Sequence, residues 1–579
     1  MRRRSSFISI LAAAGVVAVS VPVVLADDGD LEVVFEQHQD LLSGGSTGAD
    51  QSALTFGPTS PTGTGRPPRV GPNERVNSPQ AAFPNGLFGR SETSIAATDD
   101  GQQVVAGFND AQGFCGPPFG AACTPPSPPG LSGFAFSTDG GASWTDTGPP
   151  PVINHVFTRG DPWLDRGGLD GATFYYANLA IDDRTGGSLG ASVHRGHFGG
   201  PFSFQDVHVL APPNPNDFYD KEAIAAAKDG SGAAYVSLTN FIALPCPNFP
   251  NVNGAFGQIE VWRTHDGGNS WQGPAIVSPD MTSANPADPQ CGNFGVLQQS
   301  SVPAIGPNGE LYVVWQQGPT FSATGTSTDA KIMLASSLDG GATFGTPVTV
   351  ASINSMRQNA PVGYNRGRLN DHPRVAVATT GPNRGRVFVS FYSALAPVTA
   401  APRVTCPAGT PLGTICVGQR LTSSQAFVTA SDDLGQTWGS ARPVAPAPPA
   451  TGVKRLWPVV SVEAGGGVNV VYYESQETLI AGKTCNIGLG GVVRRVGPAS
   501  SLVNTFWSRS TDGGASFGAP INVSSATSNW CTTVSNIRPN FGDYIGSTSG
   551  GNRVLALWAD GRNGIPDSFY AQGLGGSSP

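Results

Sequence analysis

The chain has 579 residues, 39% of them hydrophobic, which is enough to bury a sizeable core. Glycine (77 residues) and proline (50) are abundant, whereas only 13% of the residues are charged. This composition favours many short strands joined by ordered turns over long helices. The net charge of −8 provides no basic surface for a phosphate backbone, so nucleic acid is excluded as an expected partner.

The first 26 residues have the order of a secretory signal peptide. Three arginines at positions 2–4 precede an apolar run from Phe7 to Ala26, and Asp27 follows it. A membrane anchor is the alternative, because the apolar run is just long enough to span a bilayer. We therefore predict a signal peptide at residues 1–26 and a secreted, extracellular protein.

Residues 27–72 form a short N-terminal segment and linker. The stretch from Leu31 to Leu42 predicts a short amphipathic helix, and Ser43 to Arg69 is rich in Gly, Ser, Thr and Pro. Folded structure is expected to begin near Asn73, so residues 73–579 are assigned to a single domain.

An eight-residue pattern, Ser/Thr-x-Asp-x-Gly-x-Ser/Thr-Trp/Phe, recurs along this domain. Its five copies begin at Ser137, Thr264, Ser337, Ser431 and Ser510. In such a sequence the Asp carboxylate can accept backbone N–H groups, the glycines allow positive φ, and the aromatic ring can fill the space below the turn. The pattern therefore predicts a repeated hairpin.

These hairpins resemble the Asp boxes, or BNR repeats, of the β-propellers typified by sialidases. The resemblance implies an all-β fold, a single β-propeller with four-stranded antiparallel blades around a central channel. In that family the boxes lie on the periphery of the blades, away from the catalytic centre, so no catalytic role is expected for them here.

The signature of a first strand recurs around the boxes and gives the number of blades. Seven blades are predicted, with six as the alternative, and their starts lie near Glu92, Asp161, Asp220, Val302, Asp371, Pro458 and Asp543. The blade from Asp161 carries no box, and its hairpin is reduced to His197–Phe202. The last repeat shows only three strands, so Glu74–Asn77 is expected to supply a fourth and close the ring.

The eight cysteines of an exported protein suggest disulfides. Each successive pair would fall inside the connections of one repeat. The expected bonds are Cys115–Cys123, Cys246–Cys291, Cys406–Cys416 and Cys485–Cys531. A metal site is the competing interpretation, but no CxxC or close Cys/His grouping supports it.

Charged residues are scarce, yet they gather at or beside the starts of the first strands, where a propeller channel opens. Charged side chains that converge in a concave site are energetically unfavourable, so such a cluster indicates a functional site. The candidate site residues are Arg90, Glu92, Asp161, Glu222, Asp371, His372, Arg374, Arg455, Asp543 and Tyr544. The alternative for Asp161 and Asp371 is a structural role, tying inner strands together through side-chain to backbone bonds. For His372 and Tyr544 it is ordinary packing.

The resemblance to sialidases implies specific roles for some of these residues. Three arginines would hold a substrate carboxylate, a tyrosine activated by a glutamate would attack the anomeric carbon, and an aspartate would serve as acid/base. Carried over by position, the arginines are Arg90, Arg374 and Arg455, with Tyr544 as nucleophile, Glu222 as its base and Asp161 as acid/base.

The sequence departs from the sialidase pattern in two ways, so the resemblance does not establish a sialidase site. The sequence Gly89-Arg90-Ser91-Glu92 stands roughly where sialidases carry an Arg-Ile-Pro motif. The family's ring has six blades, whereas we count seven here. The resemblance therefore covers nearly the whole ring as architecture, without establishing the substrate.

The predicted function is hydrolysis of glycosidic bonds in an extracellular glycan at the channel mouth. One alternative is a non-catalytic propeller that binds a glycan, a protein or another cell-surface ligand through the long Pro/Gly-rich loops. These loops are Phe114–Pro129, Cys246–Asn253, Thr399–Cys416 and Glu477–Arg495. The second alternative is a polysaccharide lyase that uses His372, Arg374 and Tyr544.

We expect no cofactor and a monomer. No dinucleotide fingerprint or P-loop follows a strand, which argues against a bound nucleotide. An Asp-rich channel mouth would suit a calcium ion, but no metal site is predicted.

Overall fold

The computed structural model describes residues 68–80, 88–114, 130–246, 249–278, 297–321, 327–357, 359–366, 369–398, 405, 415–417, 421–485, 493–537, 539–551 and 553–575. In these ranges the chain forms β-strands and short 3-10 turns, η1 (Ala111–Phe114) and η3 (Trp530–Thr532), and no α-helix. The all-β prediction is confirmed. The signal peptide, the helix expected at Leu31–Leu42 and most of the linker lie outside the described residues.

Five sheets have four or five strands each. The first contains β3 (Arg90–Ala97), β4 (Val104–Asp110), β5 (Ser132–Ser137) and β6 (Thr145–Gly148). The second contains β7 (Val156–Thr158), β8 (Trp163–Gly167), β9 (Thr173–Asp182), β10 (Ser188–Phe198) and β11 (Phe202–Leu210). The third contains β12 (Phe218–Ala226), β13 (Ala234–Cys246), β14 (Phe249–Thr264) and β15 (Gln272–Ile276). The fourth contains β16 (Gln298–Ile305), β17 (Leu311–Gln317), β20 (Ala330–Ser337) and β21 (Val348–Ile353). The last contains β32 (Gly546–Gly550), β33 (Arg553–Asp560) and β34 (Asp567–Leu574), together with β1 (Arg69–Val70) and β2 (Glu74–Arg75).

A sixth sheet has ten strands and includes two antiparallel runs. One run is β22 (Arg374–Val377), β23 (Val387–Ala394), β25 (Ser424–Ser431) and β26 (Arg442–Pro443). The other is β27 (Val453–Val462), β28 (Val468–Thr484), β29 (Val493–Ser510) and β30 (Ile521–Asn522), with β24 (Ile415–Val417) and β31 (Ser528–Asn529) beside β29. A single parallel bridge between Ser424 and Lys454 joins the runs. The short strands β18 (Thr320–Phe321) and β19 (Ser327–Thr328) pair separately.

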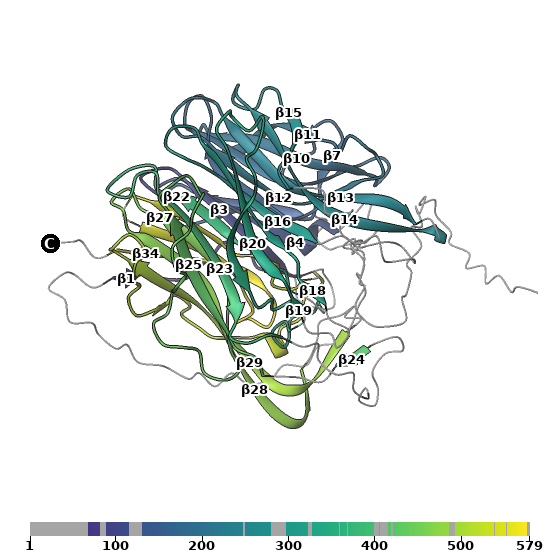
Figure 1. Ribbon diagram of the computed structural model, residues 1–579, viewed down its shortest axis with the longest axis vertical. Helices are drawn as coiled ribbons and strands as arrows, with labels where there is room; N and C mark the ends of the chain where they lie inside the picture. Colours follow the sequence, from purple (N-terminus) through teal and green to yellow (C-terminus); the bar gives the residue numbers. More distant parts are fainter. Residues whose placement is uncertain are drawn as a thin grey trace, which may run out of the picture.

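The first strands of the sheets contact one another in a closed cycle, and five of them, β3, β12, β16, β22 and β27, are labelled in Figure 1. Contacts run in order through β3, β8, β12, β16, β22, β27 and β32, and β32 contacts β3 again. The sheets radiate outward from this ring, which is the arrangement of a β-propeller. The propeller fold and its antiparallel blades agree with the prediction.

The ring is closed by strands from opposite ends of the described chain. Glu74 and Arg75 of β2 pair with Tyr570 and Phe569 of β34, as predicted. Upstream, β1 also pairs with β34, although we had assigned its residues to the linker. Because β34 receives these partners, the last sheet has no bare edge along this stretch.

The hairpins at the repeats show the expected turn chemistry. In the first copy, Ser143 donates its backbone N–H to Asp139 Oδ1 at 2.9 Å. Gly140 and Gly141 have φ of 73° and 88°, and the ring of Trp144 lies 5.1 Å from that of Tyr570 in the last sheet. The local sequence therefore fixes these turns.

Buried apolar side chains lie between neighbouring sheets. The whole of β4, for example, is buried, because a middle strand of a blade has another blade on each side. The outer strand β6 is partly exposed along its length. One apolar cluster joins β4 to residues of the last sheet, including Leu555 and Leu557. Burial between blades thus makes the ring a single unit.

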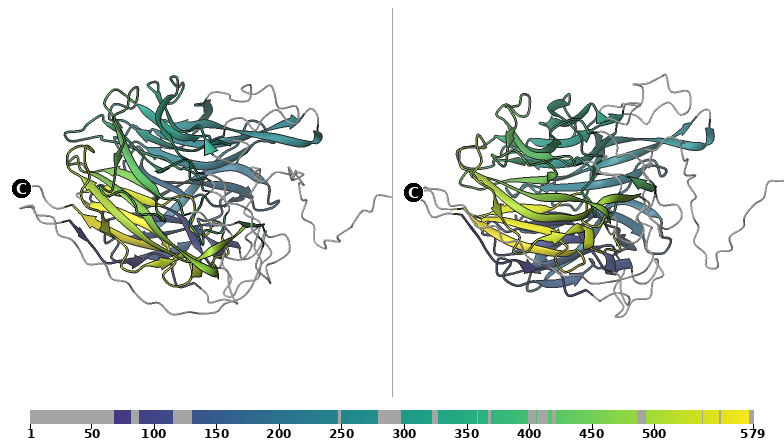
Figure 2. Two further views of the ribbon diagram at one scale, coloured as in Figure 1. Left: turned by 60° about the horizontal axis from the view of Figure 1, so that its bottom comes forward. Right: turned by 90° about the horizontal axis from the view of Figure 1, so that it is seen from below.

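Two hairpins extend beyond the starts of their first strands (Figure 2). The β13–β14 ladder continues past Phe218, the first residue of β12, to Cys246. The β28–β29 ladder likewise continues to Thr484. The described residues of the loops expected at Cys246–Asn253 and Glu477–Arg495 therefore lie mostly in strands, because antiparallel pairing satisfies backbone polar groups.

One predicted disulfide is observed. Cys485 follows β28 and is bonded to Cys531 in η3, and both residues are buried. Each of the other three expected bonds includes a cysteine outside the described residues. Within those residues no helix has the length and apolar character needed to cross a membrane.

Candidate functional site at the centre of the ring

The central site arises from a repeated backbone distortion in the first strands. Glu92, Asp161, Lys221, Ser300 and Trp457 are non-glycine residues with φ between 48° and 62°. The strand register shifts at four of these positions, as between Ser91 and Ser94 in β3 and between Asp220 and Ala223 in β12. A left-handed residue costs roughly 1 kcal/mol or more, so these bulges mark positions where the fold redirects the chain at the channel.

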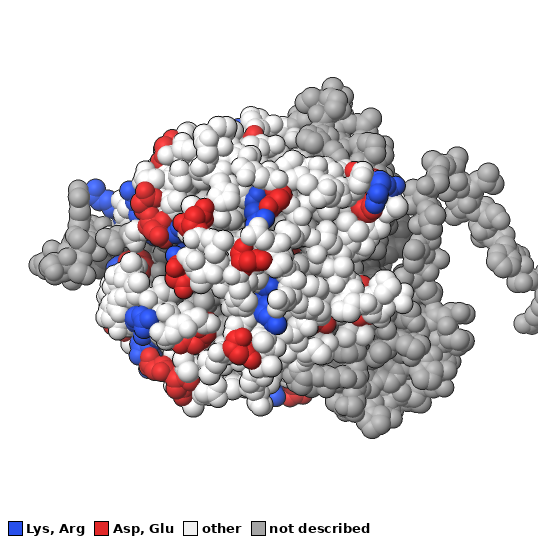
Figure 3. Space-filling model, turned by 90° about the horizontal axis from the view of Figure 1, so that it is seen from above, with Lys and Arg blue, Asp and Glu red and all other residues white. Residues whose placement is uncertain are grey.

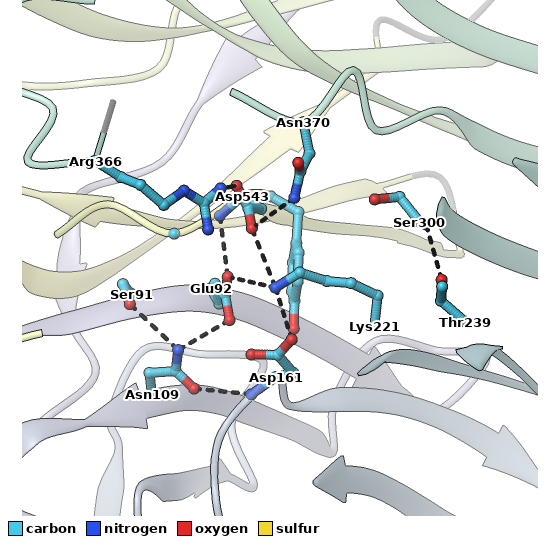
Figure 4. Close-up of polar contacts among 12 residues, drawn as sticks. Ser91, Glu92, Asn109, Asp161, Lys221, Thr239, Ser300, Arg366, Asn370 and Asp543 are labelled. Carbon is cyan, nitrogen blue, oxygen red and sulfur yellow. Dashed lines mark hydrogen bonds and ion pairs between the residues drawn. The ribbon is translucent and has the colours of Figure 1, made fainter. Parts of the chain in front are cut away.

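Lys221 occupies the centre of a buried ion cluster (Figure 4). Its Nζ atom lies 2.6 Å from Asp161 Oδ2, 3.1 Å from Asp543 Oδ2 and 3.2 Å from Glu92 Oε1. The three carboxyl side chains are 0% exposed, and Lys221 is 5% exposed. Residues from four parts of the ring therefore meet at one ammonium group.

The surroundings adjust the ionisation of this cluster. Burial alone would lower the pKa of Lys221, but Asp161, Glu92 and Asp543 together outweigh it and raise that pKa well above its ordinary value. Burial raises the pKa of Glu92 well above its ordinary value, the charge of Asp161 adds to the rise, and Lys221 opposes it. Asn109 donates its amide N–H to Glu92 Oε2 at 2.9 Å and accepts the backbone N–H of Asp161 at 3.0 Å.

Two long connections pack onto this cluster, residues 354–371 before β22 and residues 530–543 before β32. Arg366 forms an ion pair with Asp543, and Asn370 donates to Asp543 Oδ2 at 3.0 Å. Asn365 and Asn540 exchange hydrogen bonds, each side-chain oxygen accepting the other residue's backbone N–H at 2.8 and 3.2 Å. These connections therefore cover one side of the cluster, which contributes to the burial of its carboxyl groups.

An aromatic and cationic layer lies beside the cluster. The rings of Trp163, His372 and Tyr544 are 5.2 to 6.0 Å apart between centroids. Arg374 lies over Trp163 at 4.0 Å and over Tyr544 at 5.1 Å. Trp163 is the partly exposed member of this layer, and burial lowers the pKa of Arg374 to about 9.

Several polar atoms of this layer, and of Glu222 near Tyr544, are buried without a hydrogen-bond partner among the described residues. They are both carboxyl oxygens of Glu222, both ring nitrogens of His372 and Nη1 of Arg374. Burial raises the pKa of Glu222 well above its ordinary value, with Asp161 adding to the rise, and burial lowers that of His372 well below its ordinary value. Unpartnered buried groups are rare in proteins and call for a water or a ligand.

Tyr544 lies close to Asp161 and Glu222, the two carboxyl groups expected to act in catalysis. Burial raises its pKa well above the ordinary value, and the charges of Glu92, Asp161 and Glu222 add to the rise. The phenol O–H, however, donates to the backbone oxygen of Pro162 at 3.0 Å. The structure thus brings Tyr544 near Asp161 and Glu222, with its phenol O–H directed at the backbone.

The three arginines expected to hold a carboxylate have different surroundings. Arg90 pairs with Asp110 at 2.7 Å, and Arg455 pairs with Glu474 at 2.7 Å. Each pair joins directly opposed residues of two neighbouring strands. Of the three, Arg374 is the one found in the central layer, so the described contacts do not assemble the expected trio.

Asp371 accepts the backbone N–H of Met356 at 3.0 Å and a hydrogen bond from Ser355. Burial raises its pKa to about 6. It therefore holds the connection 354–371 in place, which is the structural alternative considered for it.

Within the described residues, no group of three or more His, Cys, Asp or Glu side chains is arranged to hold a metal ion. At the Asp-rich mouth, where calcium was considered, the carboxylates surround the ammonium of Lys221 instead.

The face in Figure 3 carries scattered acidic and basic side chains on a mostly uncharged surface.

Three residues that complete the site were not among the sequence candidates: Asn109, Trp163 and Arg366. Lys221 is one of the charged residues at a strand start, between two acidic neighbours, but no specific role was predicted for it. Arg366 comes from the middle of a long connection, where no repeat marks it.

No family model matches this chain, and no curated protein matches it. Solved structures resemble it weakly. An α-L-arabinofuranosidase of Fusarium graminearum shares 14% identity over 70% of this chain and 92% of its own, with a TM-score of 0.39. The leech intramolecular trans-sialidase shares 11% over 69% and 67%, with a TM-score of 0.39. A sialidase of Trypanosoma rangeli shares 10% over 71% and 57%, with a TM-score of 0.37. These neighbours are sialidases and an arabinofuranosidase, and the likeness assigns no site residue.

Proposed function

We propose that the protein is a secreted glycoside hydrolase of seven blades that acts on an extracellular glycan at the centre of the ring. The blade number is supported by the seven first strands that contact one another in a closed cycle. It counts the ten-stranded sheet as two blades, since one bridge joins its two antiparallel runs. Secretion is supported by the disulfide between Cys485 and Cys531.

The observation that carries the proposed chemistry is the environment of Glu222. Its carboxyl group is buried without a partner among the described residues, and burial raises its pKa well above the ordinary value, which favours the protonated form. Asp161 is ion-paired with Lys221. A neutral acid beside an ionised carboxylate is the division of labour that glycoside hydrolysis requires.

In this scheme Glu222 donates its proton to the oxygen of the departing sugar. As the bond to that oxygen breaks, Asp161 supports the positive charge that develops on the anomeric carbon or attacks that carbon directly. A water molecule then adds to the anomeric carbon and returns a proton to Glu222. Trp163, as the partly exposed aromatic ring of the central layer, offers a face for a sugar ring. Tyr544 and His372 would line the same site.

Two other functions have specific support. A polysaccharide lyase is favoured by the proximity of His372, Arg374 and Tyr544, because a neutral imidazole is available to remove a proton and a guanidinium can hold a uronate. A non-catalytic binding propeller is favoured by the two extended hairpins, β13–β14 and β28–β29, which project from the ring.

The test is a screen of the mature protein, from Asp27, against sialylated, arabinose-containing and uronate-containing glycans. Release of reducing sugar would indicate a hydrolase, and release of unsaturated uronate a lyase. Glu222→Gln and Tyr544→Phe are compared with matched variants outside the centre. Glu260→Gln alters a buried carboxyl bonded to Asn240 and Tyr219, and Tyr472→Phe alters a buried tyrosine of another sheet.

Turnover that Glu222→Gln abolishes and Glu260→Gln retains would support the proposed site. Glycan binding without turnover by the wild-type protein would favour the binding propeller. Equal losses in both glutamine variants would point to a folding effect and contradict the assignment of Glu222.

A further inference from the structure

Among the described residues, the buried cluster around Lys221 contains more carboxyl groups than cations. Its acids are Glu92, Asp161 and Asp543, and its cations are Lys221 and Arg366. All five side chains are at most 6% exposed. If every group were ionised, one negative charge of this set would be left uncompensated away from water, which is energetically unfavourable. Protonation of one carboxyl removes that charge.

The contacts differ among the three acids. Asp543 has ion pairs with both Lys221 and Arg366 and accepts from Asn370. Asp161 has the shortest contact with Lys221, at 2.6 Å. Both aspartates are therefore well compensated as anions.

Glu92 is the least compensated acid of the cluster. Its contact with Lys221 is the longest of the three, at 3.2 Å. It also accepts from two neutral donors, the Asn109 amide at 2.9 Å and the backbone N–H of Asp543 at 3.2 Å. Neutral donors stabilise a carboxylate less than a cation does, so the proton belongs on Glu92.

Electrostatics agree with this assignment. Burial, the charge of Asp161, a side-chain hydrogen bond with Asp161 and the charge of Asp543 all raise the pKa of Glu92, and only Lys221 lowers it. The titratable groups that face Glu92 are Asp161 before β8, Lys221 in β12, Tyr364 in one connection, and Asp543 and Tyr544 before β32.

We propose that Glu92 carries a proton at neutral pH and, with Lys221, positions Asp161 as the charged carboxylate of the centre. The protonation of Glu92 stands on the contacts above, while its role toward Asp161 rests on the proposed hydrolysis. A neutral Glu92 can donate its O–H to Asp161, and Lys221 holds the negative charge on the same group. Glu92 is thus a positioning residue and does not itself touch the substrate.

Stability provides the first test, because glutamine closely mimics a neutral glutamic acid. Glu92→Gln is expected to melt at or above the wild-type temperature at pH 7, because the unfolded variant gains nothing by ionising at this position. Asp161→Asn and Asp543→Asn are expected to lower it by several degrees, because each removes a charge that Lys221 requires. A loss in Glu92→Gln as large as that in Asp161→Asn would overturn the proposal.

The pH dependence has a defined sign. The folded pKa of Glu92 lies above its ordinary value of 4.5, so proton binding favours the folded state. The contribution is fully present below about pH 4.5 and is lost as the pH rises through the folded pKa. Glu92→Gln should remove this loss, and an unchanged pH profile would contradict the proposal.

An infrared measurement covers the case in which an asparagine variant does not fold. The difference spectrum of wild type minus Glu92→Gln at pH 7 should contain a carboxylic acid C=O band, and the absence of that band from the difference spectrum would overturn the proposal. On a glycan that is turned over, Glu92→Gln should shift the alkaline limb of the pH–kcat profile with little change in KM. Absence of any turnover would contradict the positioning role of Glu92 toward Asp161. The melting and infrared results would still decide whether Glu92 is protonated.

Discussion

Replacement of Lys221 by methionine is the most direct perturbation of the central cluster. Methionine keeps the unbranched stem and removes the ammonium, which lies 2.6 to 3.2 Å from three buried carboxyl groups. Removing one partner of a buried ion pair costs about 3–5 kcal/mol, because the remaining charges stay buried. We expect a loss in this range for Lys221→Met.

The assay is urea unfolding at pH 7, with Lys228→Met as the control, because Lys228 is an exposed lysine close in the sequence. Attraction of the three acids raises the pKa of Lys221 above 10.5 despite burial, so its contribution is fully present below about pH 10.5 and is lost as the pH rises through the folded value. The loss should also persist at high salt, since buried charges are screened little. A Lys221→Met protein as stable as Lys228→Met would refute the reasoning.

Three further predictions concern other parts of the ring. Cys485→Ser should lower the free energy of unfolding by about 2–4 kcal/mol relative to the oxidised wild type, measured by urea titration with and without reductant. Burial lowers the pKa of His194 to about 4; stability should fall as the pH drops from about 6.5 toward 4, and His194→Leu should flatten that fall in a series of melting curves. Arg455→Met should lower the melting temperature by breaking the pair with Glu474, while glycan affinity in calorimetry stays unchanged.

Each of these outcomes can be contradicted. Equal stability of Cys485→Ser and the oxidised wild type would contradict the prediction, because it would mean that the disulfide does not stabilise the folded state relative to the unfolded chain. An acid-induced loss that persists in His194→Leu would assign it to other groups. A loss of glycan affinity in Arg455→Met, with unchanged melting, would return Arg455 to the binding site.

The amino-acid sequence by itself determined the hairpins, the antiparallel blades and the strand that closes the ring. The repeat around Asp139 specifies its turn through bonds to residues at most four positions away. The strand at Glu74 could be recognised because the last repeat lacked a fourth strand. Such signals depend on local turn chemistry and on the comparison of one repeat with the next, and both can be read along the chain.

Only the tertiary structure decided which of the candidate charges meet. Arg90 and Arg455 lie at strand starts like Glu92 but pair within their own sheets. Glu92 and Asp543 are 451 residues apart in the sequence and join through a hydrogen bond at the cluster. Bulges redirect the first strands, and long connections outside the repeats add Arg366 and Asn370. These contacts exist only after the ring has closed, so no local pattern could indicate them.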